Sequence, residues 1–117
     1  MKEERGITVR AATAEDSALV LDFIQQLARY EKLEHQCVAT AEDVRATLFG
    51  PNAKAAALLA FEDGKTAGFA VYFWSYSTFL AKPGLYLEDL FVKPELRGRG
   101  IGKRIFQELL RVAKANS

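Results

Sequence analysis

The chain has almost none of the residues on which disulfide frameworks, zinc sites and histidine-based catalysis depend. Among 117 residues there is a single cysteine, Cys37, and a single histidine, His35. One cysteine cannot form a disulfide within the chain, and one histidine in a polar stretch cannot build a metal site alone. We therefore expect no intrachain disulfide, no metal and no hydrolase of the Ser-His-Asp type.

Long apolar runs and an excess of charge of either sign are also missing. The longest apolar run, 55–61, is far shorter than the roughly 20 residues that a membrane-spanning helix needs. The formal net charge is +1, so no overall field attracts the chain to nucleic acid or to a membrane. The first residues lack the apolar core of a signal peptide. We expect a cytoplasmic protein that binds neither nucleic acid nor membrane and holds any anion locally.

What the sequence does contain predicts one domain of helices and strands. Half of the residues are hydrophobic and 26% are charged, which is usual for a soluble globular domain. Alternation at 7–10 predicts a strand. An N-cap at Thr13 and apolar residues at helical spacing predict a helix to about residue 31. Thr40 begins a second, shorter helix that ends at Gly50.

Three strands and a last helix are predicted to follow. Strands at 55–62 and 66–76 flank the turn dipeptide Asp63-Gly64, and a loop at 81–84 leads to a third strand at 85–92. An amphipathic pattern predicts a helix from 101 to 113. The order β-α-α-β-β-β-α indicates an α+β fold, with helices packed on a mainly antiparallel sheet.

The most informative segment is the glycine-rich run 97–103, between a predicted strand and a predicted helix. Its three alternating glycines direct backbone N–H groups toward one point at the positive end of a helix dipole, which suits a phosphate group. Neither common phosphate motif fits. Arg97 stands where a P-loop needs its first glycine, and Lys103 stands where a dinucleotide fingerprint from Gly98 needs its third. The alternative is a flexible turn with solvated basic residues.

The run instead resembles the pyrophosphate loop of the GNAT superfamily of N-acetyltransferases, which bind acetyl-CoA. Segments 27–31, 72–78 and 86–92 are similar to the diamine acetyltransferases, the spermidine/spermine and thialysine N-acetyltransferases. The resemblance runs from about residue 7 to the end of the chain. It implies the GNAT fold and transfer of acetyl to a primary amine of a small di- or polyamine or a lysine-like molecule, by direct attack on the thioester.

The resemblance also implies which residues bind the two substrates. Backbone groups of Leu90, Phe91 and Val92 are expected to pair with the pantetheine arm. The acetyl-CoA loop would comprise Arg97, Gly98, Arg99, Gly100, Ile101, Gly102 and Lys103. The amine would face Tyr30, Glu31 and Glu88. For Tyr30 the alternative is a position in the core stripe of its helix.

Glu88 is the expected catalytic residue. An alkyl ammonium has a pKa of about 10.4, so only about one molecule in a few thousand is a free amine at neutral pH. That shortfall adds roughly 4 to 5 kcal/mol to the barrier unless a base accepts the proton. Adjacent strand residues point to opposite faces, so Glu88 and Asp89 share a face only if a bulge intervenes. The alternative for this pair is a salt-bridged or edge-protecting role.

The resemblance implies a further strand, a fourth helix and a closing hairpin after Ser117. That portion carries a tyrosine that protonates the departing thiolate, and no tyrosine of this chain matches it, so no general acid is assigned. We expect 1–117 to be a single, C-terminally incomplete GNAT domain. The exposed edge of strand 85–92 predicts a homodimer, formed by strand exchange. The alternatives are a protein or peptide N-acetyltransferase and a non-catalytic CoA-binding module.

Overall fold

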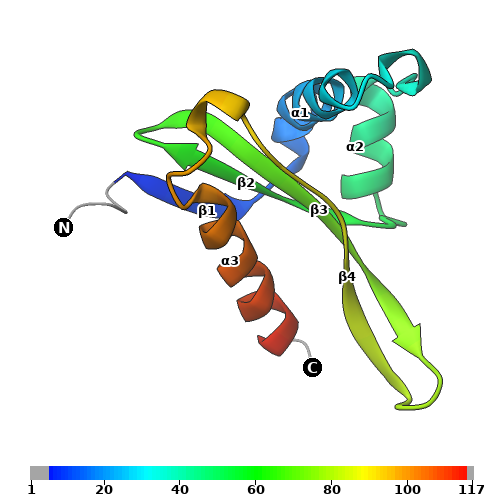
Figure 1. Cartoon of the computed structure of the whole chain (residues 1–117). Coiled ribbons are helices and arrows are strands. Elements are labelled where there is room, and N and C mark those ends of the chain that lie inside the picture. The colour runs from blue at the N-terminus through cyan, green and yellow to red at the C-terminus, as the bar shows by residue number, and fades with distance from the viewer. Residues whose placement is uncertain (1–5, 116–117) are drawn as a thin grey trace.

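A computed structural model describes residues 6–115 as a sheet with helices on both faces (Figure 1). The strands are β1 Ile7–Ala11, β2 Ala56–Glu62, β3 Lys65–Ser77 and β4 Lys82–Val92. The helices are α1 Ser17–Tyr30, α2 Ala41–Phe49 and α3 Ile101–Ala115. Single 3-10 turns lie at η1 Ala14–Asp16, η2 Glu34–Gln36 and η3 Pro94–Leu96. The predicted order and the α+β class are confirmed. No helix within 6–115 is long and apolar enough to cross a membrane.

The sheet is antiparallel throughout, in the order β1-β2-β3-β4. The predicted turn between β2 and β3 is present, and both Asp63 and Gly64 have positive φ, 53° and 82°. The predicted loop at 81–84 is wrong, because Pro83 and Gly84 pair with β3 and belong to β4. A proline fits there because β4 is the edge strand of the described sheet and its outer side needs no ladder donor.

Two hydrophobic cores lie on opposite faces of the sheet. One lies under α3, the helix predicted at 101–113, and contains its buried residues Ile101, Ile105 and Leu109. The other lies under α1 and α2, where Phe23 stacks on Phe69 with ring centroids 5.2 Å apart. The two cores therefore fix the helices that border β4: α3 packs against one face of the sheet and α1 against the other.

A β-bulge interrupts the pairing of β3 with β4. Val71 pairs with Asp89, but the next residue of β3, Tyr72, pairs with Leu87, so Glu88 is the extra residue. A bulge of this kind re-aims side chains and increases the local twist. In Figure 1 the tip of the β3–β4 hairpin extends beyond the helices.

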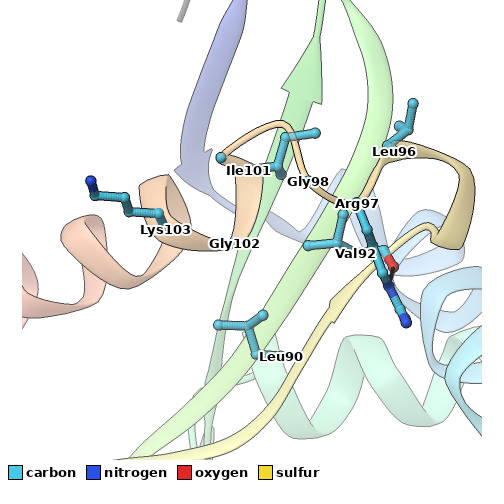
Figure 2. Close-up of a pocket in the computed structure, with 9 residues that line it drawn as sticks. Leu90, Val92, Leu96, Arg97, Gly98, Ile101, Gly102 and Lys103 are labelled. Carbon is cyan, nitrogen blue, oxygen red and sulfur yellow. Dashed lines mark hydrogen bonds between the residues drawn. The ribbon is translucent and has the colours of Figure 1, made fainter. Parts of the chain in front are cut away.

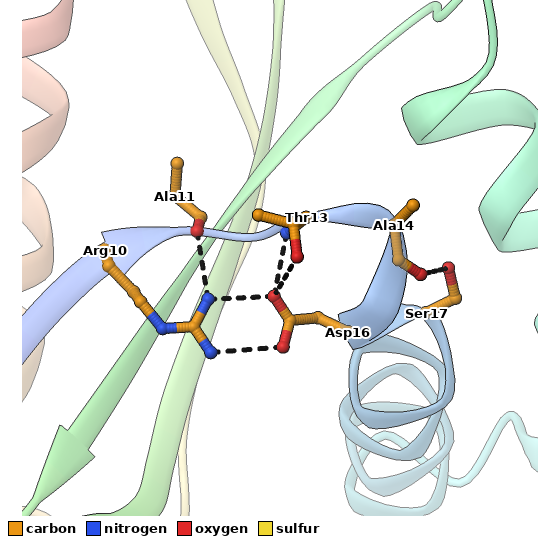
Figure 3. Close-up of polar contacts among 6 residues, drawn as sticks. All are labelled: Arg10, Ala11, Thr13, Ala14, Asp16 and Ser17. Carbon is orange, nitrogen blue, oxygen red and sulfur yellow. Dashed lines mark hydrogen bonds and ion pairs between the residues drawn. The ribbon is translucent and has the colours of Figure 1, made fainter.

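A partly exposed carboxylate, Asp16, links β1 to the start of α1 (Figure 3). Asp16 accepts hydrogen bonds from the Arg10 guanidinium at 2.8 and 3.1 Å and from the backbone N–H of Thr13 at 2.8 Å. The hydrogen bond from Arg10 is the main cause that lowers the pKa of Asp16 to about 2, against the desolvation that opposes it. Ionised Asp16 therefore stabilises the folded chain.

We expect Asp16→Asn to lower the free energy of unfolding by about 1 kcal/mol at neutral pH, because the pair is half exposed on its Arg10 side and solvent weakens it. The folded pKa lies below the unfolded value of about 3.9, so this stabilisation is complete above about pH 4 and is lost as the pH falls toward 2. Urea denaturation of Asp16→Asn and the parent between neutral pH and pH 2 measures this difference in stability. A difference between variant and parent that stays constant down to pH 2 contradicts it.

Candidate functional site

The glycine run forms an open turn beside the start of α3. Gly98 and Gly100 have φ of 86° and 85°, a region that L side chains rarely adopt. A Cβ built on either glycine meets no atom of the described chain within 4 Å, so the space beside the turn is open. A cavity of about 490 Å³ lies there (Figure 2). Its lining consists of Leu90, Val92, Leu96, Arg97, Gly98, Gly100, Ile101, Gly102 and Lys103.

Backbone N–H groups of the first turn of α3 lie at this cavity. The first helical hydrogen bond there runs from the N–H of Arg104 to the carbonyl of Gly100, at 3.0 Å. The N–H groups of residues 101–103 therefore precede the first hydrogen bond of the helix and have no partner within it. Together with the helix dipole they make a place where an anionic group is stabilised.

The basic side chains in the run and just after it extend away from the turn. Arg99 forms an ion pair with Glu62 at 3.0 Å, and Arg104 donates to the carbonyl of Ile7 at 3.3 Å. Figure 2 shows Arg97 and Lys103 extending away from the turn on opposite sides. An anion at this turn would thus meet main-chain donors first, which fits a diphosphate held mainly by backbone amides.

The last residues of β4 divide between the two faces of the sheet. Leu90 and Val92 line the glycine-turn cavity, whereas Phe91 is buried in the core under α1. The carbonyl of Val92 accepts a hydrogen bond from Nε of Arg97 at 3.0 Å. One of the backbone acceptors expected to pair with pantetheine is therefore already engaged within the chain.

A second cavity of about 490 Å³, here called the acidic pocket, lies on the α1 side of β4. Its lining consists of Ile24, Leu27, Ala28, Glu31, Leu33, Gln36, Cys37, Val38, Ala39, Glu88 and Asp89. The bulge explains why adjacent residues Glu88 and Asp89 both reach it, since a regular strand would send them to opposite faces. Three carboxylates thus line a pocket to which the described residues contribute no lysine or arginine.

Asp89 is half-buried among these carboxylates. Burial is the main cause that raises its pKa, and the charges of Glu88 and Glu31 raise it further. A cation in the pocket would relieve that repulsion, so the site suits an ammonium group. The sequence indicated Glu31 and Glu88 but not Asp89 or Cys37, because the bulge that admits Asp89 depends on pairing with β3.

Tyr30 lies at the end of α1, next to the acidic pocket but outside its lining. Tyr30 is 56% exposed, and its ring packs edge-on against Phe91 with the ring centroids 6.1 Å apart. The Tyr30 hydroxyl accepts a hydrogen bond from Nη1 of Arg97 at 2.9 Å. Tyr30 is therefore neither buried in the core nor part of the lining of the acidic pocket. Of the two neighbours Tyr30 and Glu31, only Glu31 lines the pocket.

Comparison with known proteins gives the same family as the sequence motifs. The family model described as "Acetyltransferase (GNAT) family" matches residues 21–117. Thialysine N-epsilon-acetyltransferase of Sus scrofa is 36% identical over 115 residues, covering 92% of this chain and 67% of that protein. Spermidine/spermine N(1)-acetyltransferase-like protein 1 of Homo sapiens is 34% identical over 112 residues, covering 90% of this chain and 16% of that protein.

Solved structures support the fold. An aminoglycoside acetyltransferase from an uncultured soil metagenomic sample, in complex with sisomicin, superposes with a TM-score of 0.80 at 16% identity. The match covers 94% of this chain and 71% of that one. By sequence, this chain spans about two thirds of the length of the thialysine acetyltransferases that it matches. On the family model and the 36% identity, the chain belongs to the GNAT acetyltransferase family.

Proposed function

We propose that this chain transfers an acetyl group from acetyl-CoA to a primary amine of a small di- or polyamine or a lysine-like molecule. The observation that carries the proposal is the bulge at Glu88. It brings three carboxylates to one pocket, while Leu90 and Val92, a few residues further along β4, line the glycine-turn cavity. A pocket that suits a cation and a turn that suits an anion thus both border β4.

The glycine turn would hold the donor. Its left-handed glycines and the N–H groups at the start of α3 fit a diphosphate, and the open space beside the turn leaves room for one. Acetyl-CoA, when bound, supplies a thioester carbonyl that a free amine attacks directly. Leu90 and Val92 provide apolar contacts beside the turn, and the outer edge of β4 offers backbone groups to the pantetheine arm.

The acidic pocket would hold the acceptor. Glu31 and Asp89 attract the ammonium group, and Glu88 accepts its proton, directly or through a water molecule. Glu88 suits this role because it is exposed at the bulge, next to the strand residues that border the donor cavity. No residue is assigned to protonate the departing thiolate.

We expect Asp89→Asn to stabilise the fold while weakening binding of the amine. The folded chain binds the Asp89 proton more tightly than the unfolded chain, so ionisation lowers stability as the pH rises from about 4 through the raised pKa. Asparagine removes that loss but also one charged partner of the ammonium, which should weaken spermidine binding about tenfold. Denaturation at neutral pH and calorimetry measure the two effects. A variant that is no more stable than the parent, or that binds spermidine equally well, contradicts this expectation, and Glu15→Gln on exposed η1 serves as the control.

The proposed function is tested by measuring acetyl-CoA binding by calorimetry beside thiol release with spermidine and thialysine. Binding with turnover supports the proposal. Binding without turnover favours a CoA-binding module, and turnover with a lysine peptide alone favours a protein N-acetyltransferase. Absence of both binding and turnover overturns all three. A homodimer and a cytoplasmic location stay predictions, and light scattering tests the first of these.

A further inference from the structure

Arg97 lies between the two cavities and contacts both sides. It begins the glycine run and lines the glycine-turn cavity, yet its guanidinium reaches across the end of β4 to α1. Nε donates to the carbonyl of Val92 at 3.0 Å, and Nη1 donates to the hydroxyl of Tyr30 at 2.9 Å. The guanidinium carbon also lies 4.5 Å from the ring centroid of Tyr30 and 5.6 Å from that of Phe91.

These contacts are specific to an arginine. A planar guanidinium can donate to two acceptors in fixed directions while its face lies against an aromatic ring, whereas an ammonium is a point charge on a flexible stem. One hydrogen bond joins Arg97 to Tyr30, 67 positions away in the chain, and the other joins the same guanidinium to Val92 at the end of β4. They are therefore a direct link between the end of α1 and the end of β4.

The turn after α1 links Tyr30 to the acidic pocket, because Glu31 lies in that turn and lines the pocket. The N–H of Leu33 donates to the carbonyl of Ala28 at 2.8 Å, and the N–H of Lys32 donates to the carbonyl of Arg29 at 3.0 Å. With Lys32 at a φ of 60°, this is the Schellman arrangement that fixes the backbone after a helix. Glu31, within that turn, lines the acidic pocket. A shift of Tyr30 therefore moves Glu31.

We propose that Arg97 is a positioning residue for the acceptor site: through Tyr30 it holds the end of α1, and Glu31 with it, against β4. The proposal rests on the proposed function only in treating the acidic pocket as the amine site. It gives the side chain of Arg97 a role in positioning Glu31 from outside the acidic pocket, while the main chain of the glycine run binds the diphosphate. Loss of the Arg97 side chain would then disturb the amine site more than the acetyl-CoA site.

The test combines Arg97→Lys with Tyr30→Phe, which keeps the ring and removes only the hydroxyl. Each variant is expected to weaken spermidine binding about three- to tenfold. The double variant should lose no more affinity than the single variant with the larger loss, because both substitutions remove the same contact. The Kd for acetyl-CoA, measured by calorimetry, should stay within about twofold in Tyr30→Phe, because Tyr30 does not line the glycine-turn cavity. Arg111→Lys, which alters a surface ion pair of α3, is the matched control. A loss of acetyl-CoA affinity in Tyr30→Phe as large as its loss of spermidine affinity, or effects that multiply in the double variant, overturns the proposal.

A second readout needs no substrate. Cys37 lines the acidic pocket, so its rate of reaction with a bulky thiol reagent reports the shape of the pocket. Both single variants and the double variant should change this rate by the same factor, about threefold or more, and Arg111→Lys should not. An unchanged rate in either single variant overturns the link between Arg97 and the pocket. If the parent binds no amine but this rate responds, the proposed function fails and the link stands.

Discussion

Glu88→Gln is expected to lower the rate of acetyl transfer by about 10²- to 10⁴-fold at neutral pH. Glutamine has nearly the same shape, so the bulge and the lining of the acidic pocket should persist. What is lost is the group that accepts the proton of the bound ammonium. The Kd for acetyl-CoA should stay within about threefold, because Glu88 does not line the glycine-turn cavity.

The pH dependence separates this role from a structural one. The deficit of Glu88→Gln should shrink as the pH rises toward the amine pKa of about 10.4, because more of the amine arrives already deprotonated. Glu31→Gln, in the same pocket but from the turn after α1, should instead raise KM with a smaller change in kcat. Equal losses of turnover and acetyl-CoA affinity in Glu88→Gln would remove Glu88 from the catalytic role.

Local patterns predicted most of the fold. Asp63 and Gly64 carry their own turn preference, and the spacing of Ile101, Ile105 and Leu109 defines a buried helix face without reference to the rest of the chain. The segment at Pro83 and Gly84 was misjudged for the opposite reason. Its residues favour loops, but pairing with β3 outweighs that preference at an edge strand.

The candidate site was predictable only where one segment contains it. The glycine turn is continuous in the sequence, and the expected positions of Gly98 and Gly100 require only a strand before and a helix after them. The acidic pocket depends on the pairing of Tyr72 with Leu87, which no local pattern of β4 reveals. The contact of Arg97 with Tyr30 likewise depends on how α1 packs on the sheet, so sequence spacing gives no sign of it.

Gly100→Glu is expected to weaken acetyl-CoA binding by more than about 100-fold. The substitution places an L side chain at a φ of 85° and adds a negative charge beside N–H groups that would hold a diphosphate. The turn has open space around this position, so steric overlap within the fold is not the cause of the loss. Calorimetric titration with acetyl-CoA measures the effect.

Gly64→Glu is the matched control. Gly64 has nearly the same φ, 82°, and open space around it, but it lies in the hairpin turn between β2 and β3. Both variants should lose about 1 kcal/mol of folding stability from the same backbone strain, while only Gly100→Glu should lose the ligand. If Gly100→Glu binds acetyl-CoA as tightly as the parent, or if Gly64→Glu loses as much affinity, the main-chain amides of the glycine turn do not hold the diphosphate. The donor half of the proposed function would then have no site in this fold.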